Sequence, residues 1–387
     1  MTLYRDRNLQ MVFGVTLMAI VGLSLISPAL PKIQDAFGIS KTQIGLMVTV
    51  FTIPGVVVSP LIGFFSDKRG RKGMVLLSLI VFAVAGGSIA VTRNYTLVLA
   101  LRFFQGAAAS GLSTLSMALI GDAYREQDRA DAMGYNASVL SIGAASFPMI
   151  GGALASIAWY APFYFFLLAI PIALAILRFM SIPEQKDDSD YREYLQLAKK
   201  ELSNIRFAVL IPACIVTFIL LYGPYMTYFS LYLDEIFEAD PLTIGMILSG
   251  MSITTGFVSY KSGYIFSRIG STKPIYLGLT FYGLSMMVMF SMKNIYMGIP
   301  AVFLYGLGQG LNIPILQTKF LNSVSHETRG IVSALFSSCL RLGQSIGPML
   351  MGVFFIIGEY EAVYLLSAVM SFAMAAIVLL SERKNII

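Results

Sequence analysis

The stretch that decides the fold is GFFSDKRGRK, residues 63–72. It places five charged side chains within residues 67–72, directly after an apolar run of Val, Pro, Gly, Leu, Ile and Phe. The segments on both sides are apolar enough to lie in lipid, so the cluster indicates a short loop between two membrane helices. Four basic residues in one loop would fix the orientation of those helices. Orientation alone does not explain Asp67, Gly63 or Gly70.

The composition is that of a membrane protein. The 387 residues are 57% hydrophobic and only 12% charged, whereas soluble domains carry about 25% charged residues. The apolar residues form runs of roughly 18–24, each long enough to cross about 30 Å of hydrocarbon as a helix. This predicts an all-α membrane protein with twelve transmembrane helices, near residues 10–30, 43–65, 73–92, 97–120, 135–156, 160–180, 207–230, 243–266, 274–291, 296–319, 331–356 and 361–381.

The basic residues set the expected orientation. With the N-terminus inside, most of the 27 Lys and Arg residues fall in cytoplasmic segments, so both termini are expected in the cytoplasm and the protein in the plasma membrane. The net charge of +6 is spread over short loops, which argues against a nucleic acid partner. Cys214 and Cys339 both fall inside predicted helices, where neither a disulfide nor a metal site is expected.

The two halves of the chain repeat at an offset of 200 residues. This series predicts a duplicated six-helix unit, and an even number of helices per copy makes the copies parallel. The expected organisation is a first bundle over 1–182, a linker over 183–206 with an interfacial helix at 191–203, and a second bundle over 207–387. The matching pairs are Ile44-Gly45 with Ile244-Gly245, Gly63 with Gly263, Gly70 with Gly270, Arg129 with Arg329, Gly143 with Gly343, Pro148 with Pro348, and Gly152 with Gly352.

These motifs resemble those of a known family. GFFSDKRGRK matches the loop 2–3 signature of the major facilitator superfamily, Gly-x-x-x-Asp-(Arg/Lys)-x-Gly-Arg-(Arg/Lys), and GYIFSRIGSTK at 263–273 is its degenerate partner, with Ser267 replacing the acid. Further stretches resemble the twelve-helix drug/proton antiporters, although Phe147 stands where that pattern has glycine. These stretches are Gly22-x5-Pro28-x2-Pro31, Arg102-x2-Gln105-Gly106 and Gly134-x8-Gly143-x3-Phe147-Pro148-x2-Gly151-Gly152.

The resemblance implies a latch between the halves on the cytoplasmic side. Asp67 would cap the positive N-terminal end of helix 11, and Gly63 would let helix 2 approach a neighbour closely. Arg71 can reach Asp122 or Glu126 at the inner end of helix 4. The predicted latch residues are Gly63, Asp67, Arg71, Asp122 and Arg129.

Glycine and proline recur in helices 5 and 11. Small residues allow close helix contact, and proline bends a helix by freeing a carbonyl. The predicted bending residues are Gly143, Pro148, Gly152, Gly343 and Pro348.

Charge inside the membrane marks a candidate substrate site. A central Arg costs about 2.5–3.5 kcal/mol to insert, so it normally faces a cavity. By the resemblance, helices 1, 4, 7 and 10 line that cavity, and their polar residues gather there. On helix 7, Tyr222 and Tyr225 are expected on one face at a spacing of three, although tyrosine also serves as an interface anchor. On helix 11, Gln344 is expected one turn beyond Arg341. The predicted substrate-binding residues are Ser24, Arg102, Gln105, Tyr222, Tyr225, Gln309, Asn312, Arg341 and Gln344.

No Asp or Glu lies deep in an apolar run, so a proton carrier would have to lie near the rim. The coupling candidates are Asp35, Arg102 and Asp122. The sequence favours a secondary active, proton-driven exporter of amphipathic molecules that works as a monomer without a cofactor or metal. The alternatives are a narrower exporter or flippase of an organic anion, siderophore or lipid headgroup, and, more remotely, a membrane-embedded enzyme. Two arginines without an acid favour an anionic or zwitterionic substrate.

Overall fold

The described part of every apolar run expected from the sequence is helical in the computed structural model, which describes residues 3–181, 205–261, 264, 268, 270, 272–323 and 329–384. No strand occurs among these residues. The chain divides into two compact units, residues 1–188 with 240–245, and residues 189–239 with 246–387. The predicted linker over 183–206, with its interfacial helix, lies outside the described residues apart from Ile205 and Arg206, so the predicted domain limits stay a prediction.

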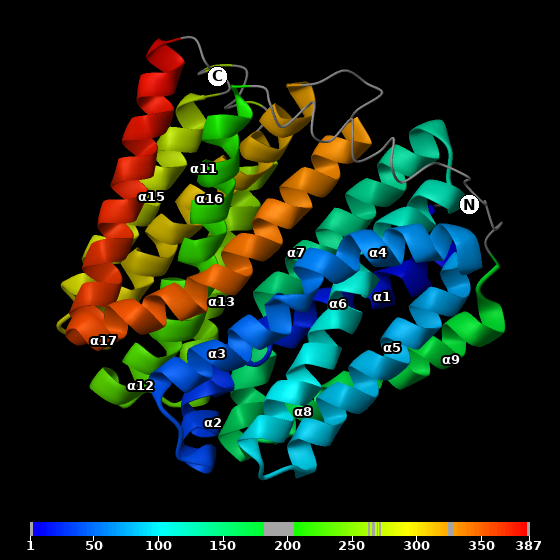
Figure 1. Cartoon of the computed structure of the whole chain (residues 1–387), viewed down its shortest axis with the longest axis horizontal. Helices are drawn as coiled ribbons and strands as arrows, with labels where there is room; N and C mark the ends of the chain where they lie inside the picture. Colours follow the sequence, from blue (N-terminus) through cyan, green and yellow to red (C-terminus); the bar gives the residue numbers. More distant parts are fainter. Residues whose placement is uncertain are drawn as a thin grey trace. The chain divides into compact units, whose positions relative to one another are not determined.

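The first unit contains the N-terminal helices, drawn from blue to green in Figure 1. Short 3-10 turns continue several of them, and α4 begins at Pro54, which breaks the second membrane segment into two helices. The elements are η1 Leu3–Arg5, α1 Arg7–Ser24, η2 Ser27–Ala29, α2 Leu30–Phe37, α3 Lys41–Thr52, α4 Pro54–Arg69, α5 Arg71–Ser88, η3 Ile89–Val91, α6 Tyr95–Ala123, α7 Glu126–Ile157, α8 Ala161–Tyr164, η4 Phe165–Leu168 and α9 Ala169–Phe179.

The second unit contains the C-terminal helices, in which α15 packs against both α16 and α17 (Figure 1). The last helix, α17, contains two non-helical residues, Gly358 and Glu359, and the ribbon reverses there as its colour changes from orange to red. The elements are α11 Phe207–Leu220, the π-helix η5 Leu221–Tyr228, α12 Phe229–Phe237, α13 Pro241–Tyr260, α15 Lys273–Phe290, η6 Ile295–Met297, α16 Gly298–Asn322 and α17 Arg329–Arg383.

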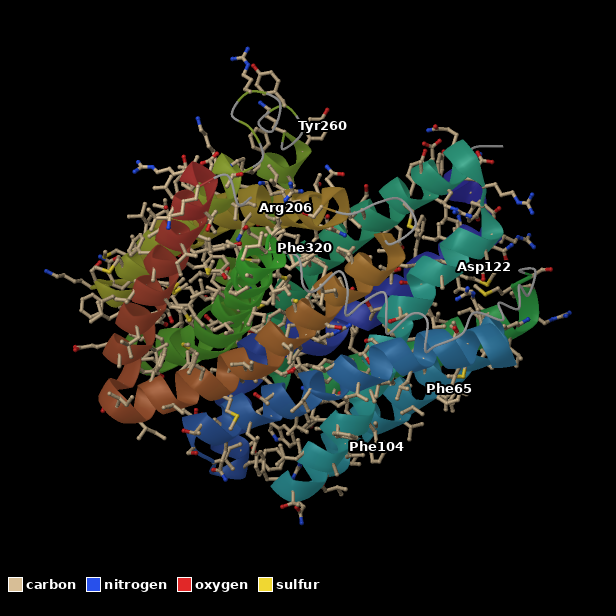
Figure 2. The ribbon with its side chains drawn as sticks, turned by 45° about the horizontal axis from the view of Figure 1, so that its top comes forward. Phe65, Phe104, Asp122, Arg206, Tyr260 and Phe320 are labelled. Carbon is tan, nitrogen blue, oxygen red and sulfur yellow. The ribbon has the colours of Figure 1, made fainter. Side chains whose placement is uncertain are left out.

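The helices account for twelve membrane spans. Ten segments of the described chain are long and apolar enough to cross a bilayer. The last of them, Leu335–Arg383, holds two helices separated at Gly358 and Glu359, and α15 is a further apolar helix of 18 residues. Large apolar side chains such as Phe65 and Phe104 are exposed (Figure 2), as lipid-facing residues are. The predicted all-α membrane fold with twelve helices is therefore confirmed.

The duplication is visible in the backbone. Gly70, between α4 and α5, has φ 91°, and Gly270, ahead of α15, has φ 85°. Both angles lie in the left-handed region, which glycine adopts without the cost that a Cβ would impose. The same turn therefore recurs at positions 200 residues apart, which explains a glycine at both.

Candidate functional site

Arg102 lies inside the first unit rather than on an open cavity. Its side chain is 1% exposed, and its Nη1 donates to the carbonyl oxygen of Gly22 and to Oε1 of Gln105, both at 3.0 Å. The guanidinium also lies over the rings of Phe51 and Phe163, 5.4 Å and 5.2 Å from their centroids. The positive charge of Arg102 is thus surrounded by a backbone carbonyl, a side-chain amide and two aromatic rings. None of these partners is a carboxylate.

The surroundings of Arg102 and Gln105 give no support to the prediction that they line a cavity, which stays a prediction. Both side chains are buried, and the Nε2 of Gln105 would lie 2.4 Å from a Cβ on Gly86, so it points into the bundle. Ser24 is also buried. An arginine can satisfy its donors within one bundle as well as in a cavity, and the sequence pattern could not distinguish the two.

Two motif glycines make room for Phe51 beside Arg102. A Cβ on Gly106 would lie 1.7 Å from the carbonyl oxygen of Phe51, and a Cβ on Gly22 would lie 2.4 Å from Cζ of its ring. The helices therefore approach so closely that no side chain larger than hydrogen fits at either position. Arg102, Gly106 and Gly22 form one packing unit around Phe51.

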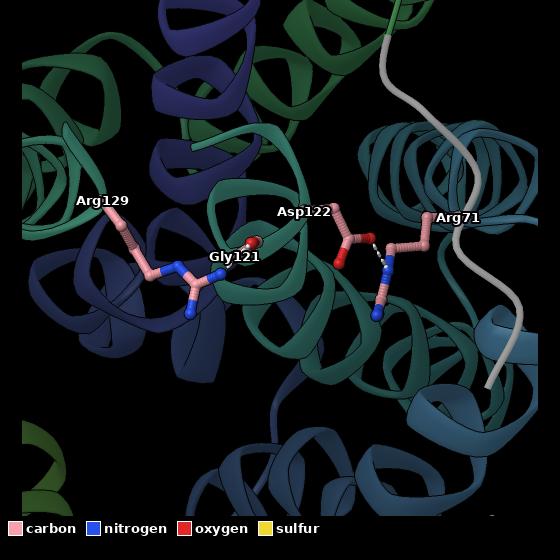
Figure 3. Close-up of polar contacts among 4 residues, drawn as sticks. All are labelled: Arg71, Gly121, Asp122 and Arg129. Atoms are coloured by element: carbon pink, nitrogen blue, oxygen red, sulfur yellow. Dashed lines mark hydrogen bonds and ion pairs between the residues drawn. The ribbon is translucent and has the colours of Figure 1, made fainter. Parts of the chain in front are cut away.

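The C-terminal end of α6 carries the ionic cluster expected from the latch motif (Figure 3). Arg71 forms an ion pair with Asp122, which the sequence predicted as one of two alternatives. Arg129 donates from Nη2 to the carbonyl oxygen of Gly121 at 2.7 Å and from Nε to that of Tyr124 at 3.1 Å. Arg129 thus satisfies carbonyls left free at the C-terminal end of α6, where the helix dipole favours a cation.

The neighbouring contacts fix the end of α9 at the same side of the unit. Lys72, the last residue of the opening stretch, donates from Nζ to the carbonyl oxygen of Met180 at 2.9 Å. The side chain of Asn8 bonds both the carbonyl oxygen and the N–H of Ser181. Lys72 is therefore more than an orientation signal. The side-chain surroundings of Gly63 and Asp67 lie outside the described residues.

Tyr124, at this same end, stays protonated. Burial, followed by the nearby negative charge of Asp6, raises the pKa of the Tyr124 phenol above its ordinary value. Asp6 itself caps α1 by accepting from the N–H of Asn8 at 2.7 Å. Asp35, the other rim carboxylate proposed for coupling, is exposed on α2.

A π-helix distorts the seventh membrane segment in the second unit. Thr227 donates from Oγ1 to the carbonyl oxygen of Tyr222 at 2.6 Å, and the N–H of Phe229 bonds the carbonyl of Pro224. The backbone bond from Phe229 to Pro224 spans five residues, which is the spacing of a π-helix, a form common at functional sites. The Gly223-Pro224 pair is the sequence signal that could have indicated a distortion at this point.

The wider turn separates the tyrosines that the sequence placed on one face. Tyr222 is partly exposed, as is Met226 four residues on, whereas Tyr225 is buried. The ring of Tyr225 stacks on Tyr305 at 4.5 Å and its hydroxyl donates to the carbonyl of Leu248. The stripe expected at α-helical spacing is therefore wrong, and of the two predicted tyrosines Tyr222 is the accessible one.

Arg341 and Gln344 lie with Tyr222. Nη1 of Arg341 donates to Oε1 of Gln344 at 3.3 Å, and the phenol of Tyr222 interacts with both side chains. Unlike Arg102, Arg341 is only part-buried. An amide and a phenol are neutral near pH 7, so neither compensates the arginine charge. We call Tyr222, Arg341 and Gln344 the arginine cluster.

Gln309 and Asn312 point between helices of the same unit. Gln309 accepts from the hydroxyl of Tyr282 at 2.6 Å, and Nδ2 of Asn312 donates to Thr217 at 2.7 Å. Both side chains are buried, so the prediction that they line an open site finds no support in their surroundings. Thr217, Tyr282 and Tyr305 were missed because hydroxyls on apolar helices carry no distinctive pattern.

The glycines predicted to bend helices 5 and 11 are points of close packing. A Cβ on Gly143 would lie 2.8 Å from Leu17, and a Cβ on Gly343 would lie 2.6 Å from the carbonyl oxygen of Ile215. Helix assignment continues through Pro148 and Pro348. Bending at these prolines and at Gly152 stays a prediction.

The comparisons with known proteins agree on one family. A family model described as Major Facilitator Superfamily matches residues 12–236 and 213–385. The chain is 27% identical over 378 residues to the quinolone resistance protein NorA of Staphylococcus aureus (strain COL), covering 94% of this chain and 93% of that one. It is 25% identical over 360 residues to the bacillibactin exporter of Bacillus subtilis (strain 168), with 88% of each covered.

Two solved structures show the same fold at lower identity. A mutant of the nucleoside transporter NupG aligns with a TM-score of 0.82 at 13% identity, covering 97% of this chain and 99% of that chain. The human organic anion transporter MFSD10 (TETRAN) aligns with a TM-score of 0.72 at 19% identity, covering 96% and 99%.

Proposed function

The chain belongs to the major facilitator superfamily, and on that premise we propose that it is a proton-driven exporter of amphipathic small molecules that works by alternating access. The family resemblance drawn from the sequence motifs is confirmed, and its members are transporters rather than enzymes. The observation that carries the direction of transport is that two relatives aligned over most of their length are named for quinolone resistance and for bacillibactin export.

The arginine cluster supports an anionic or zwitterionic substrate. The contacts of Arg341 that the structure describes are with a neutral amide and a neutral phenol, and its planar fork can donate two parallel hydrogen bonds to a carboxylate. Tyr222 offers a partly exposed ring and a hydroxyl beside it. A narrower exporter of an organic anion is the second candidate, and the same cluster favours it.

We place the exporter in the plasma membrane as a monomer with both termini in the cytoplasm. The test is efflux from proteoliposomes under an imposed pH gradient, with anionic, zwitterionic and cationic dyes of matched size. Gradient-dependent movement of several dyes supports the multidrug exporter, and movement of anions alone supports the narrower one. If no dye moves under the gradient, the proposed function is wrong.

Arg71→Ala is expected to open the cytoplasmic side while leaving the protein folded. It removes one end of the ion pair with Asp122. Both residues lie in the first unit, so the pair acts indirectly, by holding the junction of α4 and α5 next to Asp67. A contribution of about 1 kcal/mol to the closed state would change the ratio of closed to open protein about fivefold. Asp67→Asn should act likewise. The measurement is the labelling rate of single introduced cysteines from each side, with Cys214 and Cys339 replaced by Ser. Ser267→Ala, in the degenerate copy, is the control and should be nearly silent. Unchanged labelling in both Arg71→Ala and Asp67→Asn would contradict the latch.

Asp122→Asn is expected to abolish transport driven by the pH gradient while substrate binding stays measurable. Asp122 is a carboxylate at the inner rim and can exchange a proton when its ion pair opens. Arg71→Ala is the matched control, because it breaks the same pair but keeps the carboxylate. Asp35→Asn tests whether Asp35, the exposed carboxylate on α2, is the proton carrier instead. Normal gradient-driven transport in both Asn variants and in the double variant would exclude both carboxylates as carriers.

A further inference from the structure

The two cysteines of the chain meet inside the second unit. Cys214, on α11, is 0% exposed and Cys339, on α17, is 2% exposed. Sγ of Cys214 lies 4.0 Å from the carbonyl oxygen of Phe336, one turn before Cys339 on the same side of α17, which places the two thiols side by side. Both are free thiols. The sequence placed them in separate helices and gave no reason to expect this contact.

The backbones are unusually close at this point. One turn beyond Cys339, a Cβ on Gly343 would lie 2.6 Å from the carbonyl oxygen of Ile215, the residue after Cys214. The next turn repeats the pattern, because a Cβ on Gly347 would lie 2.7 Å from the carbonyl oxygen of Ile219. A disulfide needs Cα atoms about 4.4–6.8 Å apart. Glycine-lined helix packing brings neighbouring Cα atoms toward that range.

The pair lies next to the arginine cluster on both helices. Arg341 follows Cys339 by two residues on α17, and Tyr222 follows Cys214 by eight along the seventh membrane segment. The contact between Arg341 and Tyr222 therefore depends on how α11 and η5 lie against α17, which pack together (Figure 1). A covalent bond between the two cysteines would fix that packing about half a turn from Arg341 and about two turns from Tyr222.

We propose that Cys214 and Cys339 are a modification site, a thiol pair that peroxide converts reversibly into an interhelical disulfide and that thereby restrains the arginine cluster. One thiol gives up its proton and its sulfur attacks a peroxide oxygen. The O–O bond breaks, and the hydroxide that leaves takes up that proton, which gives a sulfenic acid and water. The second thiol gives up its proton and its sulfur attacks the sulfenic sulfur. The S–S bond forms as the S–O bond breaks, and the departing hydroxide takes up that proton as the second water. Two thiols lose two protons and two electrons, and one hydrogen peroxide is reduced to two waters.

The chemical test uses the whole chain in nanodiscs and needs no substrate. Because the chain has two cysteines, any disulfide within one molecule must join Cys214 to Cys339. Reduced protein is treated with hydrogen peroxide, denatured and labelled with N-ethylmaleimide. The expected result is that labelled thiols fall from two to none per monomer with a mass loss of two hydrogens, and that dithiothreitol restores both. Two thiols still labelled, oxidation only to sulfinic acid, or only intermolecular dimers would overturn the proposal.

Variants that lack one cysteine test whether the disulfide is the cause of any effect of peroxide on transport. Cys214→Ser and Cys339→Ser should each retain one thiol that cannot form the internal bond. Peroxide should slow dye efflux at least threefold in the wild type, reversibly with dithiothreitol, and should leave both Ser variants unchanged. This effect rests on the proposed function, whereas disulfide formation does not. A disulfide that forms without changing efflux in an active preparation would overturn the regulatory part.

Discussion

Gly106→Ala is expected to prevent accumulation of folded protein or to destabilise it by about 3 kcal/mol or more. The new Cβ would lie 1.7 Å from the carbonyl oxygen of Phe51, and a backbone atom cannot move aside as a side chain can. Overpacking typically costs about 1–3 kcal/mol, and a contact this short belongs at the upper end. The measurement is thermal unfolding in detergent, followed by size-exclusion chromatography of heated samples.

Gly121→Ala is the matched control, because it lies on the same helix and its Cβ would meet nothing within 4 Å. At that position alanine should stabilise the helix by up to about 1 kcal/mol relative to glycine, because its helix propensity is higher. Gly22→Ala separates the two kinds of contact, since its Cβ meets the end of the Phe51 ring rather than its backbone. Phe51→Leu should therefore rescue Gly22→Ala but not Gly106→Ala. Equal melting temperatures for Gly106→Ala and Gly121→Ala would contradict the packing described here.

This packing shows what a motif can and cannot predict. The Arg102-x2-Gln105-Gly106 pattern pointed to a functional arginine on the fourth membrane helix. Its partners Phe51 and Phe163 are ordinary aromatics on other helices. No spacing within one helix indicates which face turns toward them. The family, the helix count and the repeat could be predicted because long apolar runs, motifs and a fixed offset can be read from the sequence alone. None of them requires knowing which residues are in contact.

The second unit shows the same limit in a different form. Tyr222 and Tyr225 were placed on one face because an α-helix brings residues three apart together. The π-helix over Leu221–Tyr228 changes that periodicity and leaves Tyr222 partly exposed while Tyr225 is buried. Gly223-Pro224 signals a distortion but not its kind. By contrast, Arg341 and Gln344 were correctly paired because α17 is regular at that turn.

Arg341→Gln is expected to weaken the binding of an anionic dye tenfold or more. The substitution keeps a polar side chain beside Gln344 and Tyr222 but removes the charge and the guanidinium fork. One charge-assisted hydrogen bond contributes roughly 1.5–3 kcal/mol, which corresponds to about tenfold or more in affinity. A lipophilic cation should instead bind equally well or better, because repulsion in a low-dielectric site is relieved.

The comparison needs two further variants to assign the effect to the cluster. Lys261→Gln removes the same charge from an exposed position at the end of α13, where it should leave every affinity unchanged. Arg341→Lys keeps the charge without the planar fork and should recover only part of the binding. The dissociation constants are measured on detergent-purified protein by fluorescence titration with dyes that differ only in charge. If the wild type prefers lipophilic cations and Arg341→Gln changes no affinity, the anionic site is excluded, and the arginine is held there by its packing alone.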